Sequence, residues 1–166
     1  MHAEQVLSAL IGALFGAAGW LLVGLYMQRR LHERQARNAA RAVYFELEVN
    51  RIDVDVALRH SAFQPLSRSS FERLLPELAT WLRADELETL ARAYMSHAGY
   101  EQLHREPSIP APVRTALLQR IFDEHVAASA VLRARAFSPR EAARLASSAP
   151  IGREEAVGQA GGLHDA

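Results

Sequence analysis

The chain has 166 residues, 49% of them hydrophobic, which is enough for one modest domain with appendages. Its 19 basic residues balance 19 acidic ones, which excludes bulk electrostatic attraction to nucleic acid, so we expect no nucleic-acid partner. The sequence contains no Cys, which excludes disulfide bonds, thiolate metal sites and a Cys nucleophile.

The first segment, residues 1–28, is predicted to be a membrane anchor. Residues 5–28 carry no charge. The apolar run 6–27 would form a helix of about 33 Å at about 1.5 Å per residue, close to the roughly 30 Å hydrocarbon core of a bilayer. A cleaved signal peptide requires basic residues before a shorter apolar run, whereas this chain has Glu4 and no Arg there. We therefore expect an uncleaved transmembrane helix.

The basic residues that follow this run predict its orientation. Those assigned to the membrane surface are Arg29, Arg30, Arg34 and Arg37. Basic flanks stay on the cytoplasmic side of a membrane, and anionic headgroups attract each Arg by about 1 kcal/mol. We therefore expect a single-pass protein of the bacterial inner membrane, with the lipid bilayer as a partner and the C-terminal domain in the cytoplasm.

Small residues line one face of the predicted anchor. Ser8, Gly12 and Gly16 recur at every fourth residue, and this spacing lets two helix backbones approach closely in lipid. These three residues are the candidate helix-association site. The partner is a second copy, giving a homo-oligomer, or another membrane protein. Small residues are also common in membrane helices that pair with nothing.

Residues 43–60 nearly alternate between apolar and polar side chains, which is typical of a strand. The alternation slips at residues 50–51, and such a slip would turn half of a strand inside out. At about 100° per residue a helix needs no slip and places two apolar seams on opposite faces. One seam consists of Val43, Leu47, Val54 and Leu58, and the other of Phe45, Val49, Ile52 and Val56.

The anchor is expected to continue into this stretch as one helix from about residue 6 to residue 59. Residues 28–42 contain no Pro or Gly and are rich in good helix formers. Two opposite apolar seams predict a helix that packs against other helices on both sides. We expect one seam to pack inside the chain and the other to meet a partner, most simply a second copy. The alternative is that later helices cover both.

Four polar residues share one face of this helix and form the candidate polar site: Glu46, Asn50, Asp53 and His60. Carboxylate and imidazole side chains on a bundle helix can bind a metal ion, but the Glu-x-x-His pairs of di-iron bundles are absent. A solvated or helix-capping face is the simpler interpretation. We assign no catalytic, cofactor-binding or metal-binding residue, because phosphate-loop and nucleophile motifs are also missing.

The rest of the chain is predicted to be helical. Ser69 and Glu72 have the spacing of a capping box, and the helix that they open is expected to break or restart near Pro76. A second helix covers 83–103. After a Pro-rich loop, a third helix begins at Pro112, a residue suited to the first helical position.

Ser138 and Glu141 repeat the capping spacing and open a last short helix, and the small polar residues that follow are expected to be disordered. The chain divides into a transmembrane anchor (1–28), a juxtamembrane long helix (29–62), a helical bundle (63–146) and a disordered tail (147–166). The predicted fold class is all-α, with a transmembrane helix continuing into a long helix that packs in a small bundle.

Three motifs resemble those of a group of uncharacterised bacterial single-pass membrane proteins. The residues are Glu46, Leu47, Glu48 and Asn50 in the long helix, Leu66, Ser67 and Phe71 at the next helix, and Tyr94 near the end of a third. The resemblance covers roughly half of the chain. It implies a helical cytoplasmic domain and carries no activity and no catalytic residues.

Two classes of function fit these features. The first is a membrane-anchored interaction or scaffold module, an accessory or regulatory protein that acts at the cytoplasmic face through its second apolar seam. The second is a membrane-tethered helical enzyme or ligand-binding domain with a polar site around Glu46, Asn50 and Asp53. The first class needs nothing that the sequence lacks, so it is the preferred interpretation, and no cofactor is expected.

Overall fold

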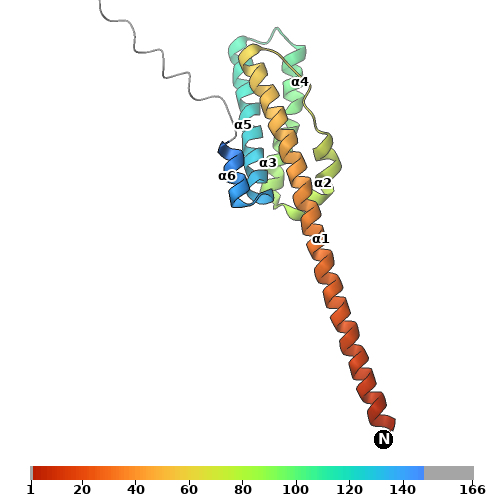
Figure 1. Ribbon diagram of the computed structural model, residues 1–166. Helices are drawn as coiled ribbons and strands as arrows, with labels where there is room; N and C mark the ends of the chain where they lie inside the picture. Colours follow the sequence, from red (N-terminus) through yellow and green to blue (C-terminus); the bar gives the residue numbers. More distant parts are fainter. Residues whose placement is uncertain (1, 148–166) are drawn as a thin grey trace, which may run out of the picture.

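Six helices make up the described part of the protein, which in this computed structural model comprises the backbone of residues 2–147 and the side chains of residues 15–147. They are α1 (His2–His60), α2 (Ser69–Trp81), α3 (Ala84–Met95), α4 (His97–Arg105), α5 (Ala111–Ala136) and α6 (Pro139–Ser147). α5 and α2 pack directly on the C-terminal part of α1, and α3, α4 and α6 pack against α5 to complete the bundle (Figure 1). The predicted all-α fold class is confirmed.

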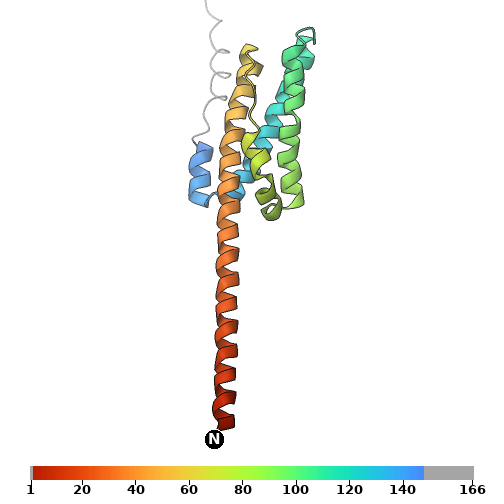
Figure 2. The ribbon, with the colours of Figure 1, turned by 90° about the vertical axis from the view of Figure 1, so that its right-hand side faces the viewer.

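α1 is a single helix of 59 residues. Its N-terminal part projects from the bundle as a rod, which both views show (Figures 1 and 2). Every side chain from residue 15 to residue 35 is exposed, and Ala36 is the first buried one. The structure confirms one continuous helix through residues 43–60 and excludes the strand alternative.

Two clusters of buried side chains form the core. In the larger cluster, Val43 and Leu47 of α1 meet leucines of three other helices: Leu78 of α2, Leu90 of α3 and Leu132 of α5. The smaller cluster lies at the far end of α1 and consists of Val54, Ala57, Tyr100, Leu103, Leu118 and Ile121, with Leu58 packed against it. One of the two predicted seams of α1 therefore lies inside the protein, and we call it the inner seam.

α2 differs from the sequence prediction in two ways. It runs unbroken through Pro76, so the predicted break is wrong. The cost of the missing N–H is offset because the next turn buries Leu78 completely. The predicted capping box is also wrong. Ser69 is already helical, and no side chain from the cap position bonds to the first turn.

The helix predicted over 83–103 is divided into α3 and α4 at Ser96. The Ser96 hydroxyl donates to the carbonyl of Ala93 at 2.6 Å, and such local bonds compete with helical ones. α5 carries Pro112 in its first turn, as predicted. Ser138 and Glu141 form the predicted reciprocal cap of α6, with bonds of 2.8 and 3.4 Å.

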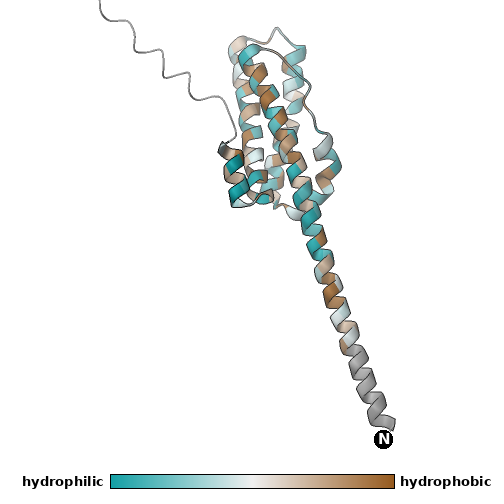
Figure 3. Cartoon of the chain, in the orientation of Figure 1, coloured by the Kyte–Doolittle hydropathy of each residue, from teal (hydrophilic) through white to brown (hydrophobic). Residues whose placement is uncertain are grey.

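No helix within the described part of the chain is both long enough and apolar enough to cross a membrane. Apolar residues do continue along the projecting part of α1 that Figure 3 colours. The side chains of Ser8 and Gly12, and residues 148–166 of the predicted tail, lie outside the described residues.

Candidate functional site

Glu46 of α1 is the centre of a buried hydrogen-bond cluster. Its side chain accepts the backbone N–H groups of Ser70 at 2.8 Å and Phe71 at 3.2 Å, and the hydroxyl of Tyr94 at 2.8 Å. The hydroxyls of Ser67 and Ser69 donate to the same carboxylate at 2.9 and 3.2 Å. Since α2 begins at Ser69, a carboxylate from α1 satisfies the N–H groups that a cap would normally satisfy.

Asn50 lies one turn further along α1 and fixes the segment before α2. Its side-chain amide donates to the carbonyl of Ser67 at 2.7 Å and accepts the N–H of the same residue at 2.9 Å. This two-bond pairing imitates a strand pair and leaves the buried amide satisfied. Glu46 and Asn50 together hold the connection between α1 and α2 against α1.

Tyr94 of α3 completes the cluster. Its ring stacks on Phe71 with centroids 4.1 Å apart and an interplanar angle of 8°. Burial, together with the neighbouring Glu46 carboxylate, raises the pKa of Tyr94, so its hydroxyl stays a donor. Residues from all three motifs of the sequence resemblance therefore meet here. They are Glu46, Asn50, Ser67, Phe71 and Tyr94.

The chemistry of Glu46 is that of a structural anion. Burial raises its pKa, but the bonds from Ser70, Tyr94, Ser67 and Phe71 outweigh burial and hold the pKa below its usual value. The carboxylate is therefore ionised and already occupied by donors of its own chain. This arrangement fits helix capping, the simpler of the two sequence interpretations.

The four residues of the predicted polar site do not form one site. The structure brings Glu46 and Asn50 together around Ser67. Asp53 is half-buried two turns beyond Glu46, and burial raises its pKa. His60 is exposed at the end of α1. Within the described residues, no three His, Cys, Asp or Glu side chains are grouped closely enough to hold a metal ion.

A buried histidine pair was not predicted from the sequence. Nε2 of His97 on α4 lies 3.1 Å from Nε2 of His125 on α5. Nδ1 of His125 lies 2.8 Å from the carbonyl of Ile121. A carbonyl only accepts, so this Nδ1 carries the proton and His97 donates to His125. Burial lowers the pKa of both histidines, that of His97 to about 3, so both are neutral.

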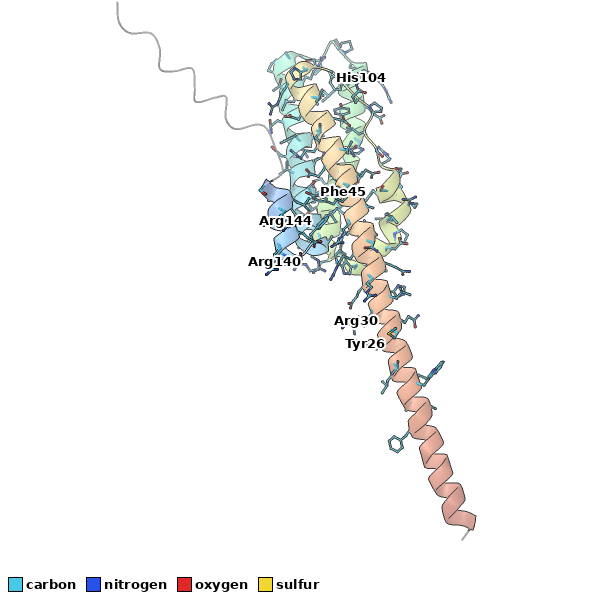
Figure 4. All side chains as sticks on the ribbon, in the orientation of Figure 1. Tyr26, Arg30, Phe45, His104, Arg140 and Arg144 are labelled. Atoms are coloured by element: carbon cyan, nitrogen blue, oxygen red, sulfur yellow. The ribbon has the colours of Figure 1, made fainter. Side chains whose placement is uncertain are left out.

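The second predicted seam of α1 lies on the outside of the bundle, and we call it the outer stripe: Phe45, Val49, Ile52 and Val56. The first three side chains are 54%, 57% and 56% exposed, and Val56 is half-buried. Figure 4 labels Phe45 on the part of α1 that lies within the bundle. Scattered exposed apolar residues are ordinary, whereas these side chains are gathered along one face of a single helix.

The predicted membrane-surface residues lie on the projecting part of α1, near the bundle. Arg29 pairs with Glu33 at 3.6 Å, and the guanidinium of Arg30 lies 5.1 Å from the ring centre of Tyr26. Arg34 and Arg37 are exposed. Gly16 is also exposed, and a Cβ added there would meet nothing within 4 Å.

Comparison with known proteins returned no matching family, no similar curated protein and no similar solved structure.

Proposed function

We propose that this chain is a membrane-anchored helical interaction module, an accessory or regulatory protein that presents its bundle at the cytoplasmic face. The observation that carries the proposal is the outer stripe. Large apolar side chains stand exposed on the same helix whose opposite seam builds the core. Their burial against a partner is favourable at about 25 cal/mol per Å².

The N-terminal part of α1 supports the anchor. The run without charge covers residues 5–28, and its described portion is helical with every side chain exposed. A bare apolar helix of this kind is costly in water and favourable in a hydrocarbon core. The described side chains cover residues 15–28 of this run. The roughly 20 residues that span a bilayer are completed by residues 6–14, which carry no charge.

The alternative, an enzyme or ligand-binding domain with a site around Glu46, Asn50 and Asp53, has less support. A general acid or base must reach the proton that it transfers, and a ligand must find unpaired donors or acceptors. Both Glu46 oxygens are bonded to the chain's own groups, and the Asn50 amide is bonded to Ser67.

The experiment that tests the proposal has two parts. In the first, membranes from cells expressing the full chain are washed at alkaline pH. We expect the chain to remain with the membranes, and a variant lacking residues 1–28 to be released. Release of the full chain would contradict the proposal that residues 1–28 anchor it in the membrane.

In the second part, a photo-crosslinking amino acid replaces Val49 in native membranes. Met95, which is 77% exposed on α3 and far from the outer stripe along the chain, provides the matched control position. We expect discrete crosslinked products from position 49 and none from position 95. The absence of products at both positions would overturn the interaction function.

A further inference from the structure

We infer that the outer stripe pairs with the outer stripe of a second copy, with the two α1 helices parallel and in register. This inference rests on the proposed interaction function and names its partner. It starts from the spacing of the stripe. Phe45, Val49, Ile52 and Val56 follow one another in steps of four, three and four residues. This is the heptad spacing of a two-stranded coiled coil, in which such side chains interlock with those of a facing helix.

The same spacing continues toward the N-terminus of α1. Further steps of three and four residues lead to Ala42, Asn38, Gln35 and Leu31. Leu31 is 57% exposed, Gln35 and Asn38 are exposed, and Ala42 is half-buried. The helix therefore presents one line of eight heptad positions, with polar residues at two neighbouring positions and apolar residues at the others.

The polar positions favour an identical partner in the parallel orientation. A polar residue at a coiled-coil core position specifies the register, because it is costly opposite an apolar side chain and tolerated opposite another polar one. In a parallel pair in register, Asn38 lies beside Asn38 and Gln35 beside Gln35 of the second copy. An antiparallel pair centred on the outer stripe would leave both without such a match.

The charges beside the stripe permit this pairing. Arg51 lies 3.0 Å from Glu48, and Arg59 lies 2.9 Å from Asp55. In a parallel pair, Glu48 of one copy approaches Asp53 of the other, since these residues occupy the positions that face each other across a parallel seam. The ion pair with Arg51 lowers that repulsion.

The area of the stripe indicates how the pair is stabilised. Phe45, Val49 and Ile52 expose on the order of 300 Å² of apolar surface per copy, so two copies bury less than the roughly 1,200 Å² of a stable specific interface. The contact is therefore weak for two dissolved bundles. Anchoring in one bilayer makes two copies parallel and raises their effective concentration, so pairing belongs to the full chain in a membrane.

The chain contains no Cys, so a single introduced Cys gives an unambiguous crosslink. In the experiment, Cys replaces each residue from 45 to 56 in turn, in the full chain reconstituted in phosphatidylcholine vesicles, and a short bis-maleimide is added. Dimer is measured on denaturing gels. Met95→Cys again serves as the exposed control.

We expect dimer yields several-fold higher at positions 45, 49, 52 and 56 than at 48, 51, 53 and 55, and a background yield at position 95. Three results would overturn the inference. A maximum at one central position alone indicates an antiparallel pair, an even yield at all positions indicates random collision, and no dimer along the stripe indicates a different partner. In the last case, products from position 49 in native membranes would still support the interaction function.

Discussion

At the scale of single residues, Glu46 shows how one side chain joins three helices. It belongs to α1, satisfies the first N–H groups of α2 and accepts the hydroxyl of Tyr94 on α3. The two carboxylate oxygens face donors only. A Gln side chain has one oxygen and one NH2 group. In place of Glu46, its NH2 group would therefore face another hydrogen-bond donor.

Glu46→Gln should lower the free energy of unfolding by about 1–3 kcal/mol, the cost of leaving a buried polar group unsatisfied. In one orientation the new amide NH2 faces the N–H of Ser70, and in the other it faces the N–H of Phe71. Urea denaturation measures the loss. The control is Glu72→Gln, which changes an exposed carboxylate near Arg68. Equal stability of the two variants would contradict the capping role.

The histidine pair predicts a pH dependence of stability. His97 has a folded pKa of about 3 against an ordinary value of 6.5, and the pKa of His125 is also lowered. The unfolded chain therefore binds more protons below about pH 6.5, and the free energy of unfolding falls as the pH decreases from there toward 3. Each histidine contributes a slope of at most about 1.4 kcal/mol per pH unit.

Urea denaturation between pH 7 and 5 measures this slope. The lowered pKa of Glu46 affects stability mainly below about pH 5, and comparison with the histidine variants separates it from the histidine contribution. His97→Gln should flatten the curve, whereas His104→Gln, a change at an exposed position on α4 (Figure 4), should not. A flat curve for the unchanged protein would show that the pair does not remain neutral.

These residue-level roles were predictable only in part. The sequence indicated a helix-capping face that included Glu46 and Asn50, but not what it caps, because Ser70 and Phe71 lie more than twenty residues further along the chain. The histidine pair joins residues 28 positions apart on two helices. The sequence carries one local indication of this burial. His97 follows the buried Tyr94 by three residues, and His125 follows the buried Ile121 by four, so each lies on the same helix face as a core residue.

At the scale of elements, α1 was the most predictable part of the fold. The two apolar seams and the polar face predicted from the helical wheel all lie where the wheel places them. The inner seam is in the core, the Glu46 face meets α2, Arg51 lies over the ring of Phe122 on α5, and the outer stripe is exposed. Periodicity identifies such faces because it depends only on the helix itself.

Paired substitutions on α1 test this assignment. Leu47→Ala should lower the free energy of unfolding by about 2–5 kcal/mol, because Leu47 is fully buried. Val49→Ala should change it by no more than about 0.5 kcal/mol, since the side chain is more than half exposed. The comparison is made by urea denaturation of dilute protein, in which pairing of copies does not contribute. Equal losses would mean that both seams are buried.

The ends of the later helices were less predictable. Pro76 indicated a break, and Ser69 with Glu72 indicated a cap, yet α2 runs through the first and lacks the second. In both cases contacts with α1 decide the outcome, through burial of Leu78 and through the Glu46 carboxylate. The cap of α6 was predicted correctly because its two bonds join Ser138 and Glu141, which are only three residues apart. Arg41 of α1 also bonds to Glu141, but the cap does not depend on that contact.

At the scale of the whole molecule, α1 connects the bundle to the proposed membrane. Ala36, the first buried residue among those described, lies eight positions after Gln28, the end of the charge-free run. In the proposed arrangement, a rise of about 1.5 Å per residue would place the base of the bundle about 12 Å from the hydrocarbon edge. Arg29, Arg30 and Arg34 lie within this interval, and Arg140 and Arg144 of α6 lie at the same end of the bundle (Figure 4).

Because these arginines directly follow the charge-free run, we expect their charge to decide on which side of the membrane the bundle lies. Arg residues next to an apolar helix resist transfer across the membrane, and in the proposed arrangement they hold the bundle in the cytoplasm. A reporter enzyme fused after Ala166 should then be active only if it is of a type that works in the cytoplasm. Replacing Arg29, Arg30, Arg34 and Arg37 with Gln, and Glu4 with Arg, removes the excess of Arg after the run, because only Arg41 then remains on that flank.

In that variant a fraction of the chains should place the reporter on the opposite side, because both flanks now compete for the cytoplasm. Two reporters, one active in each compartment, measure the fraction from the same membranes. The matched control replaces four exposed arginines far from the run in sequence (Arg73, Arg92, Arg105 and Arg120) and should leave the fraction unchanged, since charges beyond the first 15–20 or so flanking residues contribute little. An unchanged orientation in the variant with balanced flanks would mean that the arginines do not set the topology.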